Sequence, residues 1–298
     1  MAETRSFRRH LFVGSNTEEV NVGPLQPFSS YQSLFKRRNQ SLKECFQLKP
    51  ELQEAWTTAQ KKIESKLTPS DKEKRENLEK EVKLFSRDET EKAIIEKEIK
   101  LISSNEEKRV NLEKEIELYG KDAIISAMVY STNVEVVDKL NNKNTIYGHF
   151  NSYTRAFSNG NSRYKINLID VGLMTLFENL INMQEKSPVI EAGTNLYRGF
   201  ETKHSLNLKI GQTTTLGYFV STSKDFKIAY NFLENSENRS TNVNKRFIFE
   251  YSGPLFGIDM KLMSEFAYEN EILLFPYQSF IIADIAQNGS YTIVKFYP

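Results

Sequence analysis

The hydrophobic pattern of the chain changes at Pro188, and this change limits the possible folds more than any other feature. Before it, apolar residues recur with helical spacing in segments rich in Lys and Glu. After it, six short runs alternate as β-strands do, at residues 195–199, 216–223, 246–251, 271–275, 280–285 and 291–297. One predicted helix, 225–233, interrupts them, with Asp225 near its cap. Helices first and strands afterwards favour an α+β fold over a parallel α/β sheet.

The composition is that of a globular protein folded in a reducing compartment. Of 298 residues, 39% are hydrophobic and 27% are charged, and the net charge of +1 gives no argument for a nucleic acid as a partner. The single cysteine, Cys45, excludes an internal disulfide. The N-terminus lacks an apolar core of signal-peptide length, and no run is long enough to span a membrane. We therefore expect a cytoplasmic protein, or one secreted or injected into a host cell without a cleaved signal.

A repeat of 17 residues marks the charged region before residue 122, at residues 78–84, 95–101 and 112–118. Candidate N-caps recur with the same period, at Asp71, Asp88, Asn105 and Asp122. Because an α-helix turns about 100° per residue, 17 residues rotate its apolar side by roughly 260°. We therefore predict three short helices separated by turns, the last closed by Gly120. We expect these charged helices either to be solvated, with one side packed on a neighbouring element, or to form a docking surface for a partner.

These patterns divide the chain into three parts. Residues 1–48 are polar and have no sustained period, which predicts an irregular, loosely ordered N-terminus. Residues 49–122 form a helical region with the repeats, and a proline in the first turn marks a helix at 50–67. Residues 123–298 form the third part, which we expect to begin with a helix at 122–140 and a helical lobe before Pro188.

Three short polar motifs lie at or next to predicted strands of the third part. In chain order they are Arg198-Gly199, Ser221-Thr222-Ser223 and Glu269-Asn270-Glu271. Residues i and i+2 of an extended strand share a face, so we expect the two carboxylates of the last motif to lie side by side. Each motif alone is more often structural, but their combination in this order, each at a strand, indicates a functional site.

An arginine, then Ser-Thr-Ser, then Glu-x-Glu resembles the mono-ADP-ribosyltransferases of the Arg-Ser-Glu class, which include arginine-modifying toxins and their cellular relatives. The similarity extends from about residue 147 to 298. Unlike the cell-surface members, this chain lacks the cysteines for a disulfide. It implies a fold of two packed antiparallel β-sheets with a helical lobe. It also implies NAD as the substrate, no metal, and a monomer that modifies an arginine of a protein target.

The resemblance assigns the chemistry to the two glutamates. Glu271 would stabilise the oxocarbenium-like state that forms as nicotinamide leaves the ribose. Glu269 would orient the acceptor guanidinium and help to remove its proton. Ser221 would hydrogen-bond Glu271 and fix its rotamer. The segment 253–268 corresponds to the loop that presents the acceptor, and its residues Tyr268 or Phe266 would contact the incoming target.

The resemblance also implies a binding site for NAD. Arg198 would form paired hydrogen bonds with the diphosphate, and Gly199 would allow the backbone to approach the nicotinamide amide. Thr222 and Ser223 would help to hold the strand end. The aromatic face for the nicotinamide ring would come from Phe232, with Phe226 as the alternative.

Two other readings stay open at this point. The same NAD site could serve a glycohydrolase, or a transferase with a non-arginine acceptor. Alternatively, the protein could be a non-catalytic scaffold whose helices bind a partner, although the intact Arg198, Ser221 and Glu271 argue against it. The histidines, His10, His149 and His204, have no metal-binding spacing, and the chain contains neither a phosphate loop nor Gly-x-Gly-x-x-Gly.

Overall fold

The computed structural model describes residues 50–68, 75–80, 89–132, 134–137, 143–151, 171–202, 206–216, 218–234, 245–264, 266–276 and 278–298. The predicted irregular N-terminus and most of the first repeat lie outside these ranges. Asp71 and Asp88, two of the candidate N-caps, lie outside them as well. The division of the chain into three parts stays a prediction.

Nine strands are connected by hydrogen bonds in the order β3-β8-β9-β6-β4-β7-β11-β10-β5. Their bounds are β3 (Val189–Ile190), β4 (Leu196–Thr202), β5 (Thr213–Thr215), β6 (Val220–Ser223), β7 (Lys245–Tyr251), β8 (Leu255–Asp259), β9 (Glu271–Leu274), β10 (Ser279–Asn288) and β11 (Tyr291–Tyr297). Neighbouring strands are antiparallel, except that β7 and β11 pair in parallel. Together with the helices that precede it, this sheet confirms the α+β class.

The strands form two halves, β3-β8-β9-β6 and β4-β7-β11-β10-β5, that pack on each other. Within the described strands a single residue pair, Tyr197 and Ser223, joins β4 to β6. Leu196 and Phe296 of one half and Val220 of the other are buried in the same core cluster. The two packed sheets of the expected fold are therefore present, but they are joined at one point and include one parallel pair.

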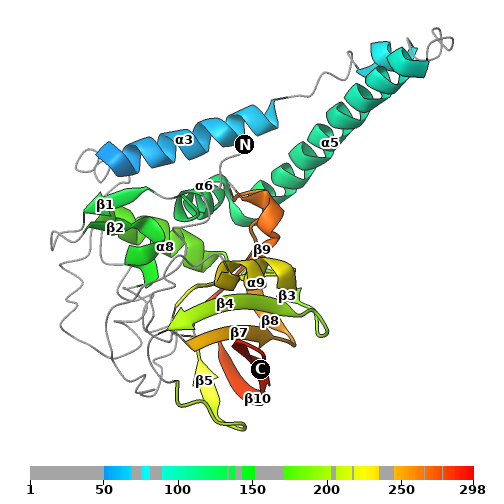
Figure 1. The fold of residues 1–298 in the computed structure, drawn as a ribbon. Helices are drawn as coiled ribbons and strands as arrows, with labels where there is room; N and C mark the ends of the chain where they lie inside the picture. The colour runs from blue at the N-terminus through cyan, green and yellow to red at the C-terminus, as the bar shows by residue number, and fades with distance from the viewer. Residues whose placement is uncertain are drawn as a thin grey trace.

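Helices cover the face of β3-β8-β9-β6 that points away from the other half of the sheet (Figure 1). They are α3 (Pro50–Leu67), α5 (Glu89–Tyr119), α6 (Lys121–Tyr130) and α8 (Val171–Asn182). A further helix, α9 (Phe226–Glu234), follows β6. Side chains alternate across a strand, so Leu274 of β9 packs between the two halves while Leu273 points to the helices. There Leu273 shares a core with Ile63 of α3 and Leu112 of α5. The helical region and the sheet therefore share one hydrophobic core.

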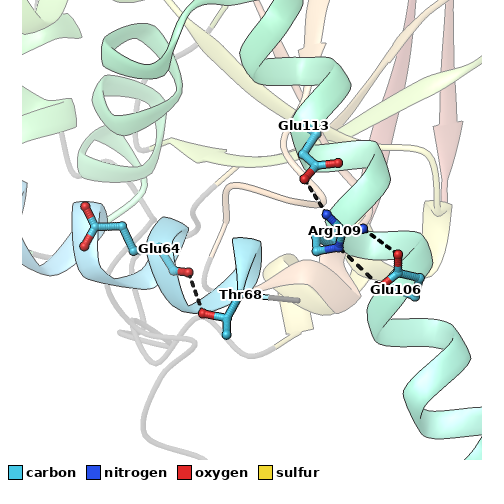
Figure 2. A network of polar contacts seen from close by, with 5 residues as sticks. All are labelled: Glu64, Thr68, Glu106, Arg109 and Glu113. Atoms are coloured by element: carbon cyan, nitrogen blue, oxygen red, sulfur yellow. Dashed lines mark hydrogen bonds and ion pairs between the residues drawn. The ribbon is translucent and has the colours of Figure 1, made fainter. Parts of the chain in front are cut away.

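The prediction of three short helices is wrong for the second and third repeats, because α5 runs through both without a break. No Gly or Pro interrupts Glu89–Tyr119, and the candidate cap Asn105 lies inside the helix. Arg109 bridges Glu106 and Glu113 at i−3 and i+4, which further favours a continuous helix (Figure 2). The rotated repeats leave Leu101 exposed to 60%, so only part of α5 packs on the core.

Two further boundaries differ from expectation. The helix predicted for residues 122–140 ends at Tyr130, and the β-branched run that follows forms β1 (Glu135–Val137), which pairs with β2 (Lys143–Thr145). Gly120 separates α5 from α6 with φ of 93°, a conformation that favours glycine, and Asp122 lies in the first turn of α6 rather than at its cap.

The segment 253–268, expected to be a loop, contains β8. This strand forms through long-range pairing, with β9 on one side and the short β3 on the other.

Candidate active site

The Arg, Ser-Thr-Ser and Glu-x-Glu motifs meet in one cleft between β4, β6, α9 and the turn before β9. It is lined by Tyr197, Arg198, Gly199, Ser221, Thr222, Ser223, Ile228, Ala229, Phe232, Glu269 and Glu271. Its cavity volume is about 50 Å³. A more open depression of about 430 Å³ at the junction of α5 and α6 holds none of these motifs, so the residues rather than the volume identify the site.

The two glutamates reach the cleft by a route that differs from the predicted one. Glu269 ends a short 3₁₀-helix, η2 (Ala267–Glu269), and Glu271 begins β9, so they do not share the face of an extended strand. Asn270 between them is left-handed, with φ of 47°. Asparagine adopts this conformation more readily than most residues, and the turn it makes lets both carboxylates line the cleft.

Burial changes the acidity of both glutamates. Burial and, less strongly, the neighbouring Glu271 raise the pKa of Glu269 to about 7. Burial also raises the pKa of Glu271, but a hydrogen bond from Ser221 and the positive charge of Arg198 oppose this change. Near neutral pH Glu269 can therefore both accept and release a proton.

The raised pKa predicts that Glu269→Gln stabilises the fold at alkaline pH. The carboxyl has a higher pKa folded, about 7, than its ordinary value of 4.5, so its favourable contribution is complete below pH 4.5 and is lost as pH rises through 7. Glutamine does not ionise. We expect its gain in unfolding free energy over wild type to be small at pH 5 and about 2 kcal/mol at pH 8, measured by urea denaturation. Equal gains at both pH values would contradict the assignment.

Arg198 lines the cleft, and its guanidinium is anchored to β6. Its Nη1 donates to the carbonyl oxygen of Ser221 at 2.8 Å. Its Nε is buried and has no hydrogen-bond partner among the described residues. Because an unsatisfied buried N–H costs free energy, this atom is a candidate donor to a bound anion.

The rest of the Ser-Thr-Ser motif connects β6 to the segment that carries the glutamates. Thr222 Oγ1 donates to the carbonyl oxygen of Ile272 at 2.7 Å. Ser223 Oγ donates to the carbonyl oxygen of Glu269 at 2.6 Å and accepts from the N–H of Asp225 at 2.9 Å. The motif therefore fixes the backbone on both sides of the turn at residue 270.

Gly199 lies where α9 crosses β4. A Cβ at this position would collide with the carbonyl oxygen of Ala229 and lie 3.2 Å from the Cβ of Phe232. Glycine thus lets the helix approach the strand, and the helix brings Phe232 into the cleft. Phe226, the alternative aromatic, is not among the lining residues; its ring packs against that of Tyr197, with the centroids 5.4 Å apart.

Gly199→Ala is expected to push α9 away from β4. Because the obstructing atom belongs to the backbone, we expect overpacking to cost about 1–3 kcal/mol of unfolding free energy. Thermal denaturation would show this as a fall of several degrees in the midpoint. Thr213→Ala, on the exposed part of β5, is the control. An unchanged midpoint for Gly199→Ala would mean that α9 shifts without cost.

The predicted acceptor-contacting aromatics lie outside the cleft lining. The rings of Phe266 and Tyr268 meet edge to face, with the centroids 6.2 Å apart. Tyr268 is 55% exposed and directly precedes Glu269. These two residues are therefore placed at the surface next to the site, not in it.

Sequence reasoning missed Tyr130 on the inner side of the site. Burial raises the pKa of its phenol, and the charges of Glu271 and Arg198 both act on it, so it lies close to the two groups. Its ring packs against Phe219, with the centroids 5.6 Å apart. In the sequence Tyr130 is one of several apolar residues of a helix, so no local pattern distinguishes it.

Two carboxylates, an arginine and a Ser-Thr-Ser strand end thus share one cleft of an α+β fold. Comparisons with known proteins identify the family to which the chain belongs. The family model for NAD:arginine ADP-ribosyltransferases matches residues 30–297. The chain therefore belongs to this family of mono-ADP-ribosyltransferases, whose substrate is NAD. The match confirms the resemblance to the mono-ADP-ribosyltransferases, and it extends through the helical region.

Curated relatives agree with this membership over shorter stretches. Ecto-ADP-ribosyltransferase 5 of Rattus norvegicus is 29% identical over 107 residues, which cover 36% of this chain and 31% of the relative. The protein of the same name from Mus musculus is 24% identical over 166 residues, covering 55% and 50%. The chain thus spans half or less of the length of the curated relatives it matches.

Solved structures of ADP-ribosyltransferases show a distant likeness. The Vis toxin from Vibrio splendidus has a TM-score of 0.46 at 17% identity, and the match covers 89% of each chain. The eucaryotic mono-ADP-ribosyltransferase ART2.2 in complex with NADH has a TM-score of 0.45 at 14% identity, covering 90% of this chain and 84% of the other.

Among the described residues of the present chain, no helix is long and apolar enough to cross a membrane, and no group of three acidic, His or Cys side chains could hold a metal ion.

Proposed function

We propose that this protein transfers ADP-ribose from NAD to an arginine side chain of a protein target. The observation that carries this proposal is the pairing of Glu271 with Glu269 in one cleft, with burial holding the pKa of Glu269 near 7. The description of the family as NAD:arginine ADP-ribosyltransferases supports it.

The proposed reaction breaks the bond between the ribose carbon and the nicotinamide nitrogen, whose electron pair leaves with nicotinamide. Glu271, held by Ser221, stabilises the positive charge that develops on the ribose. A guanidinium nitrogen of the target then bonds to the same carbon. The proton it loses passes to Glu269, which can accept it near neutral pH because of its raised pKa.

The remaining cleft residues supply the proposed NAD site. The free Nε of Arg198 would donate to the diphosphate, because a guanidinium forms strong hydrogen bonds with phosphate oxygens. Phe232 would offer its ring to nicotinamide, and Gly199 keeps the helix that carries it close to β4. Tyr268 and Phe266, on the surface beside Glu269, would contact the target.

The main alternative is hydrolysis of NAD, or transfer to a residue other than arginine. Either needs Glu271 but not an acceptor-orienting carboxylate, and the burial of Glu269 at the cleft therefore favours the arginine acceptor. A non-catalytic scaffold would have no need for the assembled cleft. A role as a toxin or secreted effector, the location of the protein and its monomeric state stay predictions.

The test is mass-resolved product analysis of the purified protein with NAD and agmatine, a small guanidino acceptor. We expect ADP-ribosylated agmatine and nicotinamide. Free ADP-ribose without modified agmatine would favour the glycohydrolase or another acceptor. No release of nicotinamide would favour the scaffold.

A further inference from the structure

Residues 260–264 and 266–269, between β8 and β9, form the acceptor segment, which carries Glu269. Turns rather than strand pairing form most of it: the N–H of Ser264 donates to the carbonyl oxygen of Met260 at 2.6 Å, and the N–H of Glu269 to that of Phe266 at 2.9 Å. Its first residue is hydrogen-bonded to β9, since the N–H of Met260 donates to the carbonyl oxygen of Glu271 at 2.9 Å. A segment built of turns depends on its neighbours for a fixed position.

One of these neighbours is α3, far away in the chain. Lys66 Nζ donates to the carbonyl oxygen of Leu262 at 2.8 Å, across 196 residues of sequence. Met260 and Met263 are buried in the core that also contains Ile63 of α3. Figure 1 shows the orange turns before β9 close to the helices, in agreement with these contacts. The acceptor segment is therefore attached to α3 by apolar packing and by one charged hydrogen bond.

The part of α3 that carries Lys66 is itself well fixed. Thr68 closes the last turn, because both its N–H and its Oγ1 donate to the carbonyl oxygen of Glu64 at 3.1 Å (Figure 2). Partial burial lowers the pKa of Lys66, and the nearby ammonium groups of Lys62 and Lys108 lower it further. Lys62 and Lys108 repel the ammonium group of Lys66, so they do not account for its position. Its hydrogen bond to the carbonyl oxygen of Leu262 does.

Glu271 shares one backbone hydrogen bond with Met260 of this segment, but its other supports lie outside it. Its backbone pairs with Ser223 in the sheet, and its carboxylate is held by Ser221 and by the charge of Arg198. Glu269 belongs to the acceptor segment, and outside this segment Ser223 Oγ donates to its backbone carbonyl oxygen at 2.6 Å. A change in the position of the segment should therefore affect the acceptor step more than the release of nicotinamide.

We infer that Lys66 is a positioning residue that ties the acceptor segment to α3 and thereby keeps Glu269 placed for transfer to the acceptor. This inference rests on the proposed function. It gives the helical region a role in choosing between arginine and water as the acceptor, in addition to any docking of a partner.

The test compares three variants of the full chain. Lys66→Met keeps the aliphatic stem and removes the donor, Lys66→Arg keeps a donor, and Lys61→Met removes an exposed charge from the same helix as a control. In Lys66→Met, we expect amide hydrogen exchange in residues 260–264 to speed up about three- to tenfold. The ratio of agmatine transfer to NAD hydrolysis should fall by a similar factor, with KM for NAD unchanged. Lys66→Arg should restore both quantities, and Lys61→Met should behave as wild type.

Each outcome decides for or against the inference. Unchanged exchange in residues 260–264 of Lys66→Met would overturn it, and so would an equal fall of transfer and hydrolysis, which indicates a general loss of structure. If the wild type fails to modify agmatine, the proposed function fails on its own account. The exchange measurement then still shows whether Lys66 holds the segment.

Discussion

Glu271→Gln is expected to reduce the release of nicotinamide from NAD by about 10²- to 10³-fold, whether the acceptor is water or agmatine. The substitution removes the negative charge that faces the developing positive charge on the ribose. Glutamine has nearly the same shape and can still accept a hydrogen bond from Ser221, so the sheet should remain intact. Nicotinamide release, followed by chromatography at saturating NAD, measures the effect.

A matched control keeps this result specific. Glu191→Gln removes a carboxylate that is exposed and outside the cleft, and it should leave turnover unchanged. If Glu271→Gln retains more than about a tenth of the wild-type rate while binding NAD normally, the charge on Glu271 does not stabilise the transition state to the extent expected of such groups.

The second large effect concerns Glu269, whose replacement by glutamine should separate transfer from hydrolysis. We expect agmatine modification to fall by about 10²-fold or more, since general base catalysis and orientation are both lost. Hydrolysis of NAD should persist, because Glu271 and its partners are unchanged. Analysis of both products in the same reaction gives the ratio directly, and an equal loss of both activities would contradict separate roles for the two glutamates.

The raised pKa of Glu269 adds a pH dependence to this prediction. Ionised Glu269 is the form that orients and deprotonates the guanidinium, and with a pKa of about 7 it amounts to about 1% at pH 5 and about 90% at pH 8. The wild-type kcat/KM for agmatine should rise nearly tenfold per pH unit below 7 and level off above it. The Glu269→Gln variant should lack this rise. A flat wild-type profile would mean that Glu269 titrates well below 7.

Local patterns predicted most of the strands and the motifs of the site. Alternation of apolar and polar residues located β4, β7, β10 and β11 to within a few residues, because one face of each strand must be buried. The same alternation did not predict β8, which forms through its pairing with β3 and β9. Sequence reasoning also failed for α5, where the rotation of the repeat predicted turns, but one helix forms through Ser103, Ser104 and Asn105 because no Gly or Pro interrupts it.

The sequence by itself determined the α+β class, the order of the three motifs and the kinds of group available at the site. These follow from the periodicity and chemistry of neighbouring residues. Only the tertiary structure decided that a left-handed Asn270 brings the two glutamates into one cleft, that burial raises the pKa of Glu269 to about 7, and that Lys66 reaches Leu262. The physical reason is that burial and long-range hydrogen bonds depend on segments far apart in the chain, whose contacts no local pattern records.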